Sequence, residues 1–124
     1  MKIAILGSGG REHAIAASIS KSSKIENIYC IPGNAGTLEI AINIDLDINN
    51  FEAIHKFLVE NKIDLVVIGP EQPLVNGIVD YLEKFNIKVF GPNKIASQLE
   101  GSKIFTKKLC EDYNIPTAKF AVLE

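Results

Sequence analysis

Short apolar runs alternate along the chain with stretches whose apolar residues recur every three or four positions. The continuous runs are rich in β-branched residues, which is typical of strands buried on both faces of a parallel sheet, and they lie at 3–6, 28–31, 40–44, 65–68 and 87–90. Helical spacing of apolar residues follows the first run and recurs at 51–59, 74–85, 94–99 and 102–113. This alternation predicts an α/β fold, a Rossmann-like and mostly parallel sheet with helices on both faces.

Local signals place several element ends. Asn49, with Glu52 three residues later, resembles a capping box that starts the helix over 51–59. The residue pair 115–116 is Ile-Pro, which ends the preceding helix because the residue before proline resists helical geometry. The sequence predicts one more strand over residues 118–123.

The helix predicted over 102–113 carries Phe105, Leu109 and Tyr113 at spacings of four residues. These side chains share one face of a helix. We expect this apolar face to lack a complete cover within this chain.

Composition and charge exclude several classes of partner. The chain has 124 residues, of which 47% are hydrophobic, enough for one domain with a core. The formal net charge of −2 gives no broad basic surface for nucleic acid or an anionic membrane. No apolar run is long enough to span a bilayer. Cys30 and Cys110 lack metal-ligand or redox spacing, and no signal peptide is visible, so we expect reduced thiols and a cytoplasmic location.

The glycine-rich turn at 7–11 lies between the first strand and the first helix, where backbone N–H groups favour an anion. A dinucleotide fingerprint would place a glycine where Glu12 stands and an acidic residue after the second strand, and a Walker loop would end in lysine and serine or threonine. All three features are missing. The remaining interpretation is a single-phosphate site made by Gly9, Gly10 and Arg11, with a tight turn shaped only by its glycines as the alternative.

Two other loops leave strand ends with unusual composition. In the loop at 32–37, Asn34, Gly36 and Thr37 offer polar groups, although such residues also make ordinary turns. In the loop at 69–73, Glu71 stands between two prolines, where a fixed carboxylate can accept hydrogen bonds from a vicinal diol such as a ribose. A solvated glutamate at a helix start is the alternative. If the fold is as predicted, all three loops converge on one cleft.

Motifs for catalysis or metal binding are not apparent in the chain. His13 and His55 are not spaced as a metal pair, and a structural role is favoured for His13 over a catalytic one. A nucleophile elbow and a pair of acid–base carboxylates are both lacking. We therefore assign no catalytic and no metal-binding residue in this chain.

The sequence resembles the N-terminal part of the phosphoribosylamine–glycine ligase family, also called glycinamide ribonucleotide synthetases. The resemblance rests on ILGSGGREHAIA, PGNAGT, DLVVIGPEQPLVNGIVDYL, FGPNKIASQLEGSKIFTKKL and YNIPTAKF, in that order. It implies an ATP-grasp ligase of purine biosynthesis. Such enzymes activate glycine with ATP and Mg²⁺ as an acyl phosphate, which the amine of 5-phosphoribosylamine attacks to give glycinamide ribonucleotide, ADP and phosphate.

The resemblance also implies a division of labour within the family. Residues 1–101 correspond to the Rossmann-like lobe that helps to hold the phosphoribosyl substrate, and residues 102–124 to a connecting helix and the start of the ATP-grasp region. The family's nucleotide-binding lysines, metal carboxylates and RFGDPE-like signature are absent from this chain. We therefore expect an inactive fragment that contributes phosphoribosylamine binding. The rival hypotheses are a dinucleotide-binding domain of an oxidoreductase and a non-catalytic scaffold.

Overall fold

Parallel strands form a single sheet at the centre of the computed structural model, which describes residues 1–121. The strands are β1 (Lys2–Gly7), β2 (Asn27–Pro32), β3 (Ile42–Asn43), β4 (Leu65–Ile68) and β5 (Val89–Phe90). Their order is β3-β2-β1-β4-β5, and every recorded pairing is parallel. The predicted Rossmann-like α/β class is confirmed.

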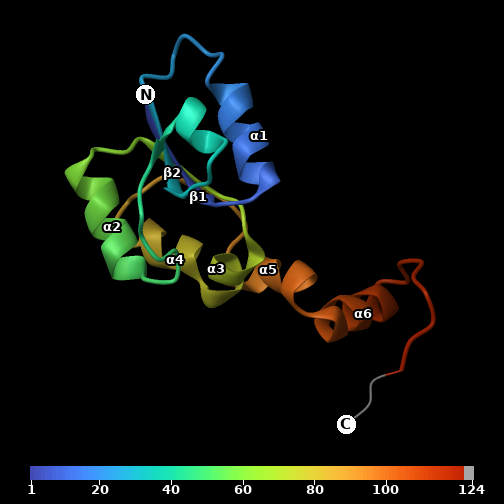
Figure 1. Ribbon diagram of the computed structural model, residues 1–124. Helices are drawn as coiled ribbons and strands as arrows, with labels where there is room; N and C mark the ends of the chain where they lie inside the picture. Colours follow the sequence, from blue (N-terminus) through green and yellow to red (C-terminus); the bar gives the residue numbers. More distant parts are fainter. Residues whose placement is uncertain (122–124) are drawn as a thin grey trace.

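Helices cover both faces of this sheet, as Figure 1 shows. Alternate residues of β1 point to opposite sides. Ile3 and Ile5 join a cluster with Ala16 of α1 (Gly10–Ile19). Ala4 and Leu6 join the larger cluster on the other face, which α2 (Phe51–Glu60), α3 (Glu71–Asn76) and α4 (Ile78–Glu83) cover. Because β1 is buried on both faces, its sequence is apolar at every position from Ile3 to Leu6 rather than at every second one.

The region predicted as one helix over 74–85 is two helices. Gly77 separates α3 from α4 with φ +94°, a left-handed conformation that a residue with a side chain adopts only at a cost. The apolar stripe continues across the break, since Leu74, Ile78 and Leu82 are all buried in the same cluster. The periodicity was therefore correct for the buried face and wrong for the continuity of the helix.

Three other boundaries differ from the prediction. The run at 40–44 contains only the two-residue edge strand β3, after a short 3-10 helix at Thr37–Glu39. The helix cap is Asn50, whose side chain accepts from the Ala53 N–H at 3.0 Å, rather than Asn49. Residues 118–121 form no strand, and the rest of the strand predicted over 118–123 lies outside the described residues.

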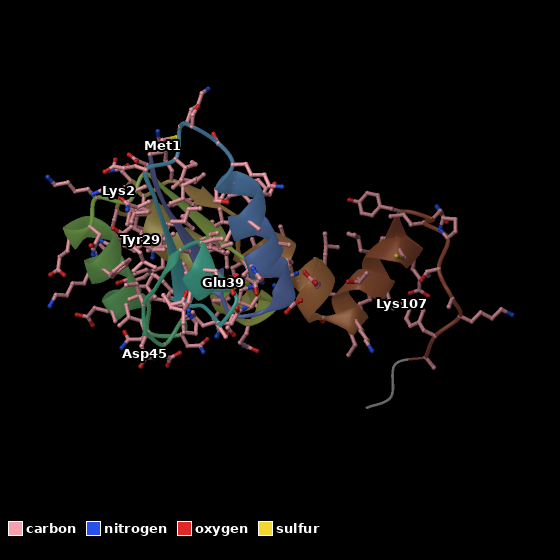
Figure 2. All side chains as sticks on the ribbon, turned by 45° about the horizontal axis from the view of Figure 1, so that its top comes forward. Met1, Lys2, Tyr29, Glu39, Asp45 and Lys107 are labelled. Carbon is pink, nitrogen blue, oxygen red and sulfur yellow. The ribbon has the colours of Figure 1, made fainter. Side chains whose placement is uncertain are left out.

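The last two helices run away from the sheet. α5 (Lys94–Gly101) packs along α3, and Ser102 separates it from α6 (Lys103–Asp112), which projects from the body in Figure 1. In Figure 2, Lys107 on α6 lies well apart from Tyr29 in the body. No residue of α6 is buried. Tyr113 just beyond it is 71% exposed, and Phe105 and Leu109 are half-buried, so the predicted incomplete cover is confirmed.

Candidate functional site at the carboxyl edge of the sheet

The three polar loops predicted to converge do so at the carboxyl edge of the sheet. They follow β1, β2 and β4, which are neighbours with β1 in the middle. Backbone bonds join them, because the Gly33 N–H donates to the Gly7 carbonyl at 3.2 Å and the Gly69 N–H to the Leu6 carbonyl at 3.0 Å. The chain builds outward from β1 on one side through β2 and β3, then continues on the other side with β4 and β5. Ligands of such sheets bind at this switch point.

Glu12 lies at the centre of the convergence, a position that the sequence did not single out as a functional one. The residue is only 4% exposed. Oε2 accepts from the Gly9 N–H at 2.7 Å, and Oε1 accepts from Arg11 Nε at 3.1 Å. Glu12 is thus the third residue of a helix whose cap is Gly9, and its carboxylate satisfies one of the N–H groups at the helix start. The signal in the sequence was a glutamate three residues after a glycine cap.

Arg11 spans the gap between the first and third loops. Its Nη2 lies 3.6 Å from Glu71 Oε1, while its Nε is held by Glu12. The pKa of the Arg11 guanidinium is raised, first by the hydrogen bond that it donates to Glu12 and then by the negative charges around it, so the group stays charged. Its side chain is about half-exposed and remains available to a ligand.

Gly10 and Arg11 open helix α1, so their backbone N–H groups point out of the helix without a partner inside it. No acceptor within residues 1–121 is recorded for either group. A Cβ built at Gly10 meets no atom within 4 Å, so the space in front of it is open. The exposed residues at the helix start that keep a donor for an anion are therefore Gly10 and Arg11, because the Gly9 N–H is occupied by Glu12 and Glu12 is itself buried.

The second loop is a closed network. Thr37 is fully buried, and its hydroxyl oxygen accepts from the Asn34 N–H at 2.8 Å while lying 2.7 Å from Asn43 Oδ1. Asn34 Nδ2 donates to the Ser8 carbonyl at 2.9 Å, which ties this loop to the glycine turn. The predicted place of Thr37 on the cleft surface is corrected, since its hydroxyl is used inside the loop. Asn34 and Gly36 stay at the surface of the loop, half-buried.

His13 packs against this loop. A Cβ built on Gly36 would lie 2.5 Å from His13 Cε1, so a larger residue there would displace the imidazole beside it. No hydrogen bond of the His13 side chain is recorded within residues 1–121. His13 therefore contributes to the site through packing between α1 and the second loop.

Glu71 stands at the first position of α3 with its side chain 49% exposed. The pKa of its carboxyl is lowered, first by a hydrogen bond from its own backbone N–H at the helix start, then by a hydrogen bond with the Glu100 side chain, and also by the Arg11 charge. The group is thus ionised at neutral pH, as an acceptor of hydroxyl hydrogen bonds must be. A hollow of about 270 Å³ lies next to it, lined largely by apolar side chains of α3 and α5.

Residues 1–121 contain no group of three or more His, Cys, Asp or Glu side chains arranged to hold a metal ion. Among the helices of the same residues, none combines the length and the apolar character that crossing a membrane requires.

Comparison with known proteins decides the family. Residues 1–100 match the family described as phosphoribosylglycinamide synthetase, N domain. The chain belongs to this family. It is 45% identical over its whole length to the phosphoribosylamine–glycine ligase of Caldanaerobacter subterraneus, and 54% identical over 97% of its length to that of Mesorhizobium japonicum. It spans 30% and 28% of the length of these two relatives.

A solved structure supports the same assignment. The phosphoribosylamine–glycine ligase of Thermotoga maritima superposes with a TM-score of 0.69 over 98% of this chain and 27% of that one, at 31% identity. The resemblance of the sequence to the synthetase family is therefore confirmed.

The geometry of the glycine turn also disfavours the dinucleotide alternative. In dinucleotide-binding folds the pyrophosphate crosses the glycine turn at the helix start. Here Glu12 stands where that fold has its third glycine, and its carboxylate already accepts from the Gly9 N–H at 2.7 Å. The Gly9 N–H is therefore not free to bind a pyrophosphate.

Proposed function

We propose that this chain supplies the phosphoribosylamine-binding part of a phosphoribosylamine–glycine ligase, an enzyme that forms glycinamide ribonucleotide in purine biosynthesis. The observation that carries the proposal is the Arg11–Glu71 contact across the switch point, beside the open N–H groups of Gly10 and Arg11. A cation and a helix start on one side of a cleft, with an ionised carboxylate on the other, suit a phosphate joined to a sugar.

The proposed substrate contacts follow the chemistry of each group. The N–H groups of Gly10 and Arg11 and the Arg11 guanidinium bind the 5′-phosphate, with Gly9 keeping the turn open to it. The Glu71 carboxylate accepts hydrogen bonds from the ribose hydroxyls. Asn34 and Gly36 line the cleft, and Thr37 holds their loop in shape.

Substrate binding changes the partner of Arg11. Arg11 Nη2 faces Glu71 at 3.6 Å, a separation longer than a hydrogen bond. A phosphate offers the guanidinium two charged acceptors at once, which is the stronger arrangement. The Arg11–Glu71 contact therefore keeps both side chains at the cleft, and breaking it costs little free energy because both groups are exposed.

We also propose that the ligase activity uses ATP and Mg²⁺, as the family implies. The described residues hold no carboxylate cluster that fits Mg²⁺, so no step of the chemistry is assigned to them. A division after residue 101 belongs to the same proposal and is supported by α6, which has no buried residue. A cytoplasmic location is supported by the free thiols of Cys30 and Cys110.

The experiment is a titration of the isotope-labelled chain with glycinamide ribonucleotide, followed through its backbone amide signals. We expect the Gly10 and Arg11 signals to shift, and the affinity to fall about tenfold in Arg11→Gln, which loses a charge-assisted contact. Lys21→Gln is the matched control, because it removes the same charge just beyond the other end of α1. Equal losses in the two variants, or an unmoved glycine turn, would refute the proposal.

A further inference from the structure

Glu12 is the most buried carboxylate of the described residues, and it stands directly behind the proposed phosphate site. A buried carboxylate costs free energy unless its oxygens are well partnered. Both Glu12 oxygens are used, one by the Gly9 N–H and one by Arg11 Nε. Neither partner is itself buried, since Arg11 is about half-exposed and Gly9 is exposed. The carboxylate therefore connects the interior of the domain to two groups on the cleft.

Three glycines from two loops make room for this side chain. A Cβ at Gly7, Gly9 or Gly69 would fall within 2.9 Å of a Glu12 atom, in each case on the carboxylate end of the side chain. Gly7 and Gly9 belong to the turn after β1, whereas Gly69 follows β4. An ordinary helix cap requires no such clearance from a distant loop. The surroundings are thus shaped to hold this carboxylate in one place.

We propose that Glu12 is a positioning residue for the substrate phosphate, an inference that rests on the function proposed above. By holding Nε of Arg11, it fixes the plane of the guanidinium and leaves its Nη atoms facing the cleft. By occupying the Gly9 N–H, it confines the anion to the N–H groups of Gly10 and Arg11.

A purely structural role makes a different prediction. If Glu12 only joined the loops after β1 and β4, its loss would lower stability and weaken every ligand contact, whatever residue stood at position 11. If it acts through Arg11, its loss matters only while Arg11 is present. Energetic coupling between the two positions distinguishes the cases, since independent sites give additive effects.

The test compares Glu12→Gln, Arg11→Gln and the double variant, with glycinamide ribonucleotide as the titrant and amide signals as the readout. Glutamine keeps an oxygen for the Gly9 N–H and removes the charge that holds Arg11. We expect Glu12→Gln to bind about tenfold more weakly and the same change to have less than about a twofold effect in the Arg11→Gln background. Glu26→Gln, an exposed carboxylate next to the amino end of β2, is the control for charge.

A second variant guards against loss of folding in Glu12→Gln. Arg11→Lys leaves the buried carboxylate intact and keeps the positive charge, but lacks the planar fork that Glu12 orients. We expect it to bind about as weakly as Glu12→Gln. Wild-type affinity in Arg11→Lys would overturn the inference.

The remaining outcomes separate the two proposals. If glycinamide ribonucleotide leaves the wild-type Gly10 and Arg11 signals unmoved, the proposed function fails and the role of Glu12 fails with it. If those signals move and Glu12→Gln binds like the wild type, only the role of Glu12 is overturned. That role is likewise overturned, and the proposed function kept, if Glu12→Gln weakens binding equally with and without Arg11.

Discussion

Gly69→Ala tests whether the loop after β4 holds the Glu12 carboxylate in place. Gly69 is buried, and a Cβ there would overlap Glu12 Oε1 and lie 2.5 Å from its Cδ and 2.6 Å from its Cγ. The overlap extends from Oε1 back to Cγ, so the whole carboxylate end of Glu12 has to move to relieve it. The carboxylate is expected to leave its position and to lose its bonds to Gly9 and Arg11.

The size of the effect follows from those two bonds. The bond from the Gly9 N–H to a partly buried carboxylate contributes about 1.5–3 kcal/mol. The pair with Arg11 adds less than about 1 kcal/mol, because the guanidinium is half-exposed and screened by water. Alanine also raises the free energy of unfolding by about 0.4–1 kcal/mol, because it restricts the conformations of the unfolded chain. The net loss of unfolding free energy is about 2 kcal/mol.

Thermal unfolding followed by circular dichroism measures this loss. For a chain of 124 residues, about 2 kcal/mol corresponds to a fall in Tm of roughly 6–10 °C. Gly10→Ala is the matched control, because a Cβ there meets no atom within 4 Å and the residue begins a helix. We expect this variant to keep or slightly raise Tm. Equal Tm values for the two variants would show that Gly69 does not confine Glu12.

Three further outcomes are expected from the same structure. Leu6→Ala, at a fully buried position of β1, should cost about 2–5 kcal/mol of unfolding free energy by denaturant titration, whereas Leu38→Ala, at a 65% exposed position, should stay within about 0.5 kcal/mol. Gly77→Ala should cost about 1–2 kcal/mol, since alanine must adopt φ +94° between α3 and α4. The lowered pKa of Glu71 means that its contribution to stability is present above pH 4.5 and is lost as the pH falls through the folded-state pKa. The Tm advantage of the wild type over Glu71→Gln should therefore vanish in acid.

Each of these outcomes has a result that contradicts it. Similar costs for Leu6→Ala and Leu38→Ala would mean that β1 is not the centre of the core. An unchanged free energy in Gly77→Ala would mean that the backbone there is not left-handed. A Tm difference between the wild type and Glu71→Gln that is as large at pH 3 as at pH 7 would exclude ionisation of Glu71 as its source.

The strands were predictable to within two residues where burial on both faces left a continuous apolar run. β1 and β4 are the clearest cases, since each lies between two other strands. At the edge of the sheet the same signal overestimated β3, because only Ile42 and Asn43 find a partner in β2. The break in the helix at Gly77 was not predicted, because hydrophobic periodicity reports which face is buried and not whether the backbone is continuous.

The candidate site was predictable as a set of loops, but not as a set of contacts. The order of strands and the glycine turn were enough to bring Arg11 and Glu71 together. Thr37 was misplaced because a hydroxyl in a loop looks the same in the sequence whether it faces a ligand or a partner such as Asn43. Glu12 was recognised as the wrong residue for a dinucleotide site. Its burial depends on Gly69, which lies far along the chain, and no local pattern reveals that dependence.

The position of β1 in the sheet has a consequence for how the chain folds as it is made. β1 is synthesised first, yet it is the middle strand, and its pairing with β4 joins Ile3 to Leu65. While residues 65–68 are still unmade, one edge of β1 has no strand beside it, and such an edge can pair with another chain. The nascent chain therefore has to remain unassociated until β4 emerges. A chaperone has most to protect while the residues between β1 and β4 are being synthesised.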